Sequence, residues 1–422
     1  MTSKPQTRDM LGRTTLTPVP EARSILLDQL QKISPETETI RIEDGLDRVL
    51  AQSIFSAENL PPHPRSVMDG FAVCAADTFG ASESMPCYLQ ITGNVAMGEM
   101  PVGEVQRGCC FKIATGGFLP KGADAVIMHE HTVPVDETMI EIVKGGGPGT
   151  AIIGVGDDIR EGEEALKPGH LLRPQDLGLL AALGITQIKV YRQVRVGIVS
   201  TGDEIVPHSE QPGPGKIRNI NSVALVGLIS RAGAIPTDYG IVSDQREVFF
   251  PVLENALKEN DIVLFSGGSS VGVRDLGEQA VESLGPPGIL VHGVKLKPGK
   301  PVLIGLSGTK PVFGLPGHPV SALVCFDLFV APAIKQLSGE VTGPKPTATV
   351  TAKLSRNLNS AAGRLDLVRV RLIQEKGSCI AEPVMGKSGA ISTLSRAHGY
   401  FLIDEDSQGV TQDSPVEVYI YS

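Results

Sequence analysis

Residues 261–275, DIVLFSGGSSVGVRD, join an apolar run to a loop of glycine and serine that ends in an aspartate. The run from Asp261 to Phe265 predicts a buried strand, because it is short and apolar and turn residues follow it. The loop exposes backbone N–H groups and hydroxyls where a helix is expected to begin, an arrangement that can bind an oxyanion. Asp275 is therefore unexpected at its end, because a carboxylate repels an anion.

The same order of strand, loop and helix recurs along residues 193–338, where apolar runs alternate with helical patterns. This alternation predicts a doubly wound α/β domain, with a parallel sheet and helices on both faces. In open sheets of this kind ligands bind beyond the carboxyl ends of the strands. Three loops are expected at such ends: STGDE (200–204), SGGSSVG (266–272) and GLPGHP (314–319).

The rest of the chain divides into smaller units. Residues 1–17 are polar and mildly basic and predict a disordered tail. Residues 61–150 carry short strand-like pieces between glycines and prolines, which predicts a small β domain. The flanking residues 18–60 and 151–192 are predicted to form one discontinuous N-terminal α+β domain that includes the helical pattern EARSILLDQLQKI. Alternating residues from 346 to 422 predict a C-terminal β-barrel.

Bulk composition excludes several classes of protein. With 422 residues, 41% hydrophobic and 20% charged, the chain has the composition of a soluble protein of several domains. A net charge of -9 argues against binding to nucleic acid or an anionic membrane, although a local site can oppose this sign. The longest apolar region, residues 319–334, predicts a buried helix that is too short and interrupted to span a bilayer. Six cysteines without zinc-site spacing and the lack of a signal peptide predict reduced thiols and a cytoplasmic location.

Acidic residues stand beside glycine or hydroxyl residues in several loops, and they suggest a metal site. These acids are Asp69, Asp158, Asp203, Glu204, Asp244 and Asp275. Each one alone is more simply a turn or a helix cap. Together with an anion-binding loop they would repel the ligand, by roughly 4 kcal/mol for two unit charges 4 Å apart at an effective dielectric of 20. Mg²⁺ removes this conflict, because it takes oxygen ligands from carboxylates and phosphates together.

Two further segments offer groups for anions. KLKPGKP places Lys295, Lys297 and Lys300 near the same edge of the predicted sheet, although lysines are more often solvated surface residues. Thr115 in KIATGG offers a hydroxyl and neighbouring N–H groups to a second anion. The sequence contains no nucleophilic triad signature, no GxGxxG fingerprint and no HExxH pattern.

Seven motifs in this order resemble the MoeA family of molybdopterin molybdenumtransferases, whose eukaryotic relatives include gephyrin. The motifs are SVMDGFAV, ATGGFLPKGADAVI, GDDIREGE, STGDE, SGGSSVGVRD, KLKPGKP and GLPGHPVSA. The resemblance covers nearly all of the chain after the tail. It implies an elongated four-domain subunit, a molybdopterin-binding α/β domain and a homodimer whose active sites are shared between subunits.

The resemblance also implies a reaction and its residues. Molybdate enters the dithiolene of adenylylated molybdopterin, the phosphoanhydride is cleaved and AMP leaves, with Mg²⁺ as cofactor. The family pattern assigns catalytic positions to Asp69, Thr115, Asp158, Glu204, Asp244 and Asp275, of which Asp69, Glu204, Asp244 and Asp275 are metal ligands. It assigns substrate binding to Gly267, Gly268, Ser270, Gly272, Lys297, Lys300, Pro316 and Pro319. A molybdopterin adenylyltransferase and molybdoenzyme acceptors are the partners that it suggests.

The sequence departs from the family pattern at several positions. His318 and His398 replace a usual asparagine, Ser269 replaces valine or threonine, and Leu367 replaces phenylalanine. An arginine normally found before Asp158 is missing from residues 153–155. These departures leave the preference between molybdate and tungstate open.

Two alternatives to this function stay open from the sequence: a paralogue that handles tungstate, and a non-catalytic pterin-binding scaffold. Adenylylation of molybdopterin is disfavoured, because 422 residues leave no room for a fused second domain of the adenylyltransferase type.

Overall fold

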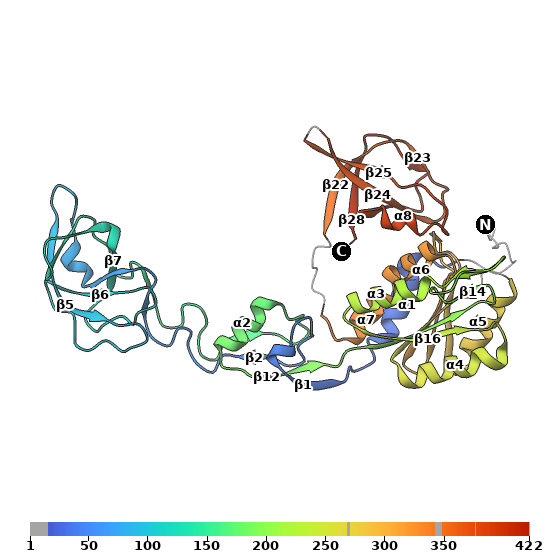
Figure 1. The fold of residues 1–422 in the computed structure, drawn as a ribbon, viewed down its shortest axis with the longest axis horizontal. Helices are drawn as coiled ribbons and strands as arrows, with labels where there is room; N and C mark the ends of the chain where they lie inside the picture. Colours follow the sequence, from blue (N-terminus) through green and yellow to red (C-terminus); the bar gives the residue numbers. More distant parts are fainter. Residues whose placement is uncertain (1–15, 268–270, 342–347, 376, 422) are drawn as a thin grey trace, which may run out of the picture.

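The computed structural model describes residues 16–267, 271–341, 348–375 and 377–421. For residues 271–275 it describes the backbone but not the side chains. The chain is elongated (Figure 1). A small β unit lies at one end, a unit with helix α2 lies in the middle, and an α/β unit and a β-barrel lie together at the other end. This arrangement confirms the multidomain α/β plus β fold predicted from the sequence, while the exact domain boundaries stay a prediction.

A six-stranded sheet forms the centre of the α/β unit. Its spatial order is β16 (Ile235–Val242), β13 (Arg195–Thr201), β17 (Ile262–Gly267), β21 (Lys310–Leu315), β20 (Leu303–Ser307) and β18 (Pro287–His292). The first four strands are parallel, as predicted, but β20 runs antiparallel to both of its neighbours. The prediction of an all-parallel sheet is wrong here because only Gly308 and Thr309 separate β20 from β21, and such a short turn makes a hairpin.

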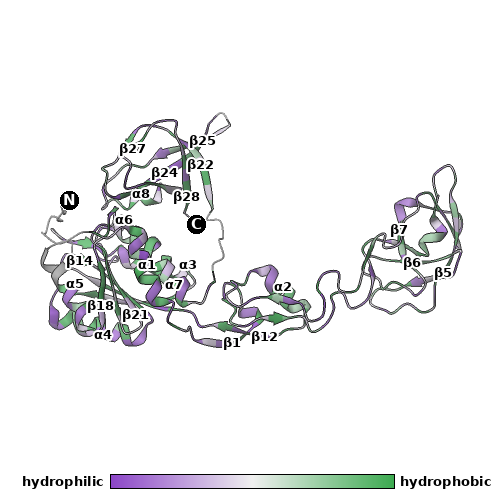
Figure 2. Cartoon of the chain, turned by 180° about the vertical axis from the view of Figure 1, so that it is seen from behind, coloured by the Kyte–Doolittle hydropathy of each residue, from purple (hydrophilic) through white to green (hydrophobic). Residues whose placement is uncertain are grey.

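Helices cover both faces of this sheet. One apolar cluster joins the sheet to α1 (Val19–Leu30), α3 (Asn221–Arg231), α6 (Pro319–Cys325) and α7 (Ala331–Leu337). A second cluster, on the opposite face, includes α4 (Arg246–Glu259) and α5 (Val271–Ser283). These helices alternate between hydrophobic and hydrophilic residues, as helices with one buried face do (Figure 2).

Helix α1 packs against a different unit from the one in which it was predicted. Residues 18–60 were predicted to belong to the N-terminal α+β domain, but Ala22, Leu26 and Leu30 are fully buried in the core of the α/β unit. The predicted tail, residues 1–17, lies mostly outside the described residues. Its last residue, Thr17, is ordered: its N–H donates to Gly293 O at 3.2 Å and its carbonyl accepts from Lys295 N at 2.9 Å.

The apolar region after Pro319 is one continuous helical stretch, in which the π-helical turn Phe326–Val330 connects α6 to α7. By length and composition Pro319–Leu337 could cross a membrane, so the expectation that it is too short was wrong. The prediction of a buried helix is confirmed, because Phe326, Phe329 and Val330 are buried in the α/β core.

The remaining units are built from short strands. The small β unit is a sheet with the order β7 (Ala125–Met128), β4 (Gly70–Val73), β6 (Cys109–Ile113), β5 (Cys87–Val95), β9 (Met139–Ile142) and β8 (Thr132–Pro134). The middle unit contains α2 (Pro174–Ala182) and the pairs β1 (Thr37–Arg41) with β12 (Gln187–Tyr191) and β2 (Ile54–Phe55) with β11 (Glu164–Leu166). β3 (Arg65–Ser66) pairs with β10 (Ile152–Ile153).

The C-terminal unit forms a barrel that takes one strand from the α/β unit. Its order is β19 (Leu296–Lys297), β24 (Leu365–Glu375), β25 (Ser378–Pro383), β22 (Thr349–Leu354), β28 (Pro415–Ile420) and β26 (Gly399–Ile403). A further pairing of β24 with β26 closes the barrel. Because β19 precedes β20 of the central sheet, this pairing joins the two units directly.

Candidate functional site

The three predicted ligand loops begin at adjacent strands of the central sheet. β13 and β17 pair in parallel with Thr201 beside Gly267, and β17 and β21 pair with Ser266 beside Leu315. All three strands therefore end at one edge, where ligands bind in sheets of this type. The placement of these loops at one sheet edge, inferred from periodicity alone, is confirmed.

Close backbone contact explains the glycine at the start of the cradle. A Cβ atom built on Gly267 would lie 1.7 Å from Thr201 O, which no side chain can occupy. A Cβ on Gly317 would lie 3.6 Å from Gly267 C, so the loop after β21 lies against the end of β17. Of the other predicted cradle residues, Gly268 and Ser270 lie outside the described residues, and Gly272 lies in α5.

Acidic side chains gather at the carboxyl ends of β13 and β16. The hydroxyl of Thr201 donates to Oδ1 of Asp244, and the N–H of Asp244 donates to Oδ1 of Asp203 at 3.4 Å. Glu204 is exposed in the same loop as Asp203. Glu204 and Asp244, predicted on separate motifs, therefore follow neighbouring strands. Asp275 lies in the first turns of α5, and its side chain is outside the described set.

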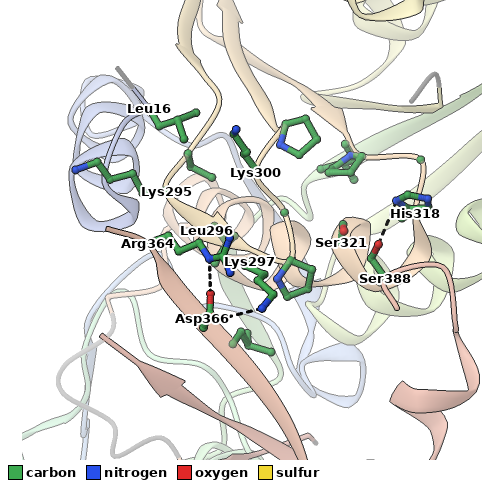
Figure 3. A pocket seen from close by; sticks show the side chains of 18 of the residues that line it. Leu16, Lys295, Leu296, Lys297, Lys300, His318, Ser321, Arg364, Asp366 and Ser388 are labelled. Carbon is green, nitrogen blue, oxygen red and sulfur yellow. Dashed lines mark hydrogen bonds and ion pairs between the residues drawn. The ribbon is translucent and has the colours of Figure 1, made fainter. Parts of the chain in front are cut away.

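A cleft of about 1450 Å³ lies between this sheet edge and the C-terminal barrel (Figure 3). Gly267 and the loop Pro316–His318 line one wall, and the loop that contains Lys297 and Lys300 lines another. Pro316 is buried after β21, and Pro319 is buried as the first residue of α6, so both prolines shape the backbone of the wall. The cleft thus collects substrate-binding positions that the sequence analysis assigned on three different motifs.

The barrel supplies cleft residues that sequence reasoning missed. Arg364, Asp366, Arg369, Lys387 and Ser388 line the cleft. Ser388 Oγ lies 3.2 Å from Nδ1 of His318, so the unusual histidine contacts the barrel across the cleft (Figure 3). Two other departures have structural roles: His398 Nδ1 accepts from Leu372 N at 3.2 Å, and Leu367 is buried. Ser269 lies outside the described residues.

Asp69 and Thr115 form a pair in the small β unit, far from the cleft of the same chain (Figure 1). The N–H and the hydroxyl of Thr115 donate to Oδ1 of Asp69 at 2.6 and 2.9 Å. These bonds hold the pKa of Asp69 below its usual range, so the exposed carboxylate stays ionised. The neighbouring N–H groups of Gly116 and Gly117 donate to backbone carbonyls. This corrects the expectation that Thr115 and its neighbours donate to a second anion.

Asp158 lies apart from both groups. It is exposed in the connection between β10 and β11, and its N–H donates to Leu60 O at 3.0 Å. One chain therefore does not bring the six predicted catalytic residues together. Among the side chains that the structure describes, no three His, Cys, Asp or Glu residues form a group that could hold a metal ion.

Nevertheless, the chemistry of the donors fits Mg²⁺ in part. Glu204 and Asp244 offer carboxylate oxygens, which this hard cation prefers. Mg²⁺ usually takes only one or two protein carboxylates and completes its octahedron with phosphate and water oxygens. The two acids after β13 and β16 satisfy that requirement at an edge where a phosphate could also bind.

Three family models match successive parts of this chain. The MoeA N-terminal region (domain I and II) matches residues 17–184, the model described as "Probable molybdopterin binding domain" matches residues 197–336, and the MoeA C-terminal region (domain IV) matches residues 351–421. Together they span the middle unit with the small β unit, the α/β unit and the barrel.

Similar proteins extend over almost the full length. A molybdopterin molybdenumtransferase of Haemophilus influenzae is 32% identical over 94% of this chain and 97% of its own. One from Bacillus subtilis is 31% identical over 97% of this chain and 95% of its own. A crystal structure of a molybdopterin biosynthesis MoeA protein from Pyrococcus horikoshii OT3 is similar with a TM-score of 0.82 and 33% identity, covering 96% of this chain and 100% of that chain.

Proposed function

Because this chain belongs to the MoeA family, we propose that it is a molybdopterin molybdenumtransferase of molybdenum cofactor biosynthesis. Its substrates are adenylylated molybdopterin and molybdate, and its products are the molybdenum-loaded pterin and AMP. The observation that carries this proposal is the cleft of about 1450 Å³ between the barrel, which supplies arginines, and the carboxyl edge of the central sheet, which supplies lysines and also bears exposed acids. That combination suits a phosphorylated ligand held with a divalent cation.

The roles of the residues follow from their positions. Lys297, Lys300 and Arg364 line the cleft and attract the phosphoanhydride. The backbone of Gly267 allows the ligand to approach the sheet edge closely. Glu204 and Asp244 would hold Mg²⁺, which when bound supplies a Lewis acid that neutralises charge on the phosphate oxygens.

If Asp69 takes part in the reaction, the active site needs residues from two chains. In one chain the small β unit, which carries this residue next to β4, lies at the opposite end of the molecule from the α/β unit and the barrel (Figure 1). We therefore propose a homodimer in which the small β unit of one subunit supplies Asp69 to the cleft of the other. Thr115 then acts by orienting the Asp69 carboxylate rather than by binding an anion. A cytoplasmic location, a molybdopterin adenylyltransferase as supplier and molybdoenzymes as acceptors complete this proposal.

The test is AMP release. Purified protein is incubated with adenylylated molybdopterin, molybdate and Mg²⁺, and AMP is quantified by chromatography. We expect molybdate-dependent AMP release that stops after exhaustive chelation and returns with added Mg²⁺. Full release after chelation would refute the metal role, and binding of the pterin without any release would favour a scaffold.

A matched control variant tests the role of Glu204 in this assay, and a second oxyanion tests its specificity. Glu204→Gln removes a proposed ligand charge and should abolish release. Glu382→Gln removes an acid that is ion-paired with Arg371 on the barrel and should leave release unchanged. Parallel reactions with tungstate address the alternative that this chain handles the heavier oxyanion. Release with tungstate alone would establish that alternative.

A further inference from the structure

The C-terminal barrel reaches into the cleft at the lysine loop. Strand β19 of this loop pairs in parallel with β24 of the barrel, with Leu296 beside Leu365 and Lys297 beside Asp366. The N–H of Leu365 also donates to Lys295 O at 2.9 Å. The backbone of the lysine loop is therefore fixed by a strand of another unit, about 70 residues away in the sequence.

The side chains at this junction form a small ionic network (Figure 3). Asp366 is 5% exposed, and its two carboxylate oxygens accept from different cations. Arg364 Nε donates to Oδ1 at 2.9 Å, and Lys297 Nζ donates to Oδ2 at 3.3 Å. The Lys297 side chain is 56% exposed and the Arg364 side chain 37%. A buried acid thus holds two cations whose side chains stay open to solvent.

This geometry has a consequence for anion binding. A free lysine side chain loses rotamer freedom when a ligand immobilises it. Asp366 restricts the side chain of Lys297 before the ligand binds, so part of this entropy loss has already occurred on folding and does not weaken ligand binding. Asp366 also neutralises one of the two cationic charges, which opposes anion binding. The two effects have opposite signs, and an experiment can separate them.

We propose that Asp366 is a positioning residue for Lys297, so that the C-terminal barrel completes the anion-binding side of the cleft. This inference rests on the proposed function in so far as Lys297 is taken to bind a phosphate. It gives the barrel a part in substrate binding that could not be inferred from the sequence, because Asp366 and Lys297 are far apart along the chain. Asp366 itself does not contact the substrate; it acts through Lys297.

The experiment is a double-mutant cycle with inorganic pyrophosphate as the probe, measured by calorimetry on the full chain without added metal. The variants are Lys297→Ala, Asp366→Asn and their combination. We expect each single substitution to weaken pyrophosphate binding about fivefold and the double variant to bind no more weakly than Lys297→Ala, because contacting residues are coupled.

Lys300 provides the matched control for coupling. It lines the same cleft, and no ion pair links it to Asp366 in the part of the chain that the structure describes. Lys300→Ala and Asp366→Asn should therefore weaken binding independently, so that their fold-changes multiply. Glu382→Gln, on the strand next to β24, controls for the loss of an acidic charge from the barrel and should leave binding unchanged.

Several results would overturn the proposal. If Asp366→Asn binds pyrophosphate as tightly as the wild type, or more tightly, the acid is only a counter-charge. Fold-changes that multiply for Lys297 and Asp366 would equally refute positioning. If the asparagine variant does not fold by circular dichroism, the same cycle is run with Asp366→Glu, which keeps the charge but moves the carboxylate. This variant should weaken pyrophosphate binding in the wild-type background and not in the Lys297→Ala background, and no effect in either background would refute positioning. AMP release by the wild type is scored separately, so failure here leaves the proposed function standing.

Discussion

Replacing Gly267 by alanine tests whether backbone contact between β13 and β17 builds the anion cradle. The new Cβ would lie 1.7 Å from Thr201 O, whereas real Cβ atoms stay beyond 3.0 Å, so the two strand ends must separate by about 1.3 Å. Both strands are central in the sheet, and Ser200 and Ser266 beside this point are buried. Forcing one methyl group into such a packed region typically costs 1–3 kcal/mol, so we expect a loss of about 2 kcal/mol in unfolding free energy.

The assay is urea denaturation followed by circular dichroism, combined with pyrophosphate binding. Gly227→Ala is the matched control, because it lies in α3 of the same unit with nothing within 4 Å of its Cβ position. That variant should be more stable than the wild type by about 0.5–1 kcal/mol, as expected for glycine to alanine inside a helix. Wild-type stability together with unchanged pyrophosphate binding in Gly267→Ala would refute the argument.

Three further predictions concern the other acids. One chain carrying Asp69→Ala and a second carrying Asp244→Ala should each be inactive as homodimers. An isolated mixed dimer of the two should recover about half of the wild-type AMP release, because one site then carries both substitutions and the other none. No recovery would refute the shared site. Thr115→Val removes a donor to Asp69 and should raise the pKa of that carboxyl, so the acid limb of the pH–rate profile should move to higher pH; an unmoved limb would exclude a role for this carboxylate. Burial raises the pKa of Asp327 from 3.8 to about 6, so the folded state favours the protonated carboxyl. The wild type should therefore lose up to about 3 kcal/mol of unfolding free energy between pH 4 and pH 7. Urea titrations at each pH should show this loss in the wild type and not in Asp327→Asn.

Local patterns were sufficient to predict the α/β unit and the edge at which its loops meet. The alternation of apolar strands and amphipathic helices is a local property, and β13, β16, β17, α3 and α4 all lie where it predicts them. The same logic placed the loop of Glu204 at the edge where parallel strands of one sheet end. That Asp244 follows the neighbouring strand became evident only from the strand order.

Contacts between distant segments were not predictable in the same way. The pattern of α1 shows that Leu26 and Leu30 share a buried face, but periodicity does not say which unit covers that face. The pairing of Lys297 with Asp366 depends on β19 joining a barrel strand, and a two-residue strand carries almost no signal of its own. Thr115 was predicted to be a functional position, yet its hydrogen-bond partner, Asp69, became evident only from the structure.

The order of loops along the sheet edge explains how acids and bases can serve one anionic ligand. Asp244 follows β16, Glu204 follows β13, and the lysine loop follows β18 at the opposite end of the sheet. Four strand spacings separate β13 from β18, which corresponds to roughly 19 Å. That distance exceeds the Debye length of about 8 Å at physiological salt, so the acids hardly weaken the attraction of Lys297 and Lys300 for a phosphate. Under the proposed function, Asp244 and Glu204 at this edge therefore do not contradict anion binding: the basic end would attract the ligand, and the acidic end would accept it only together with a divalent cation.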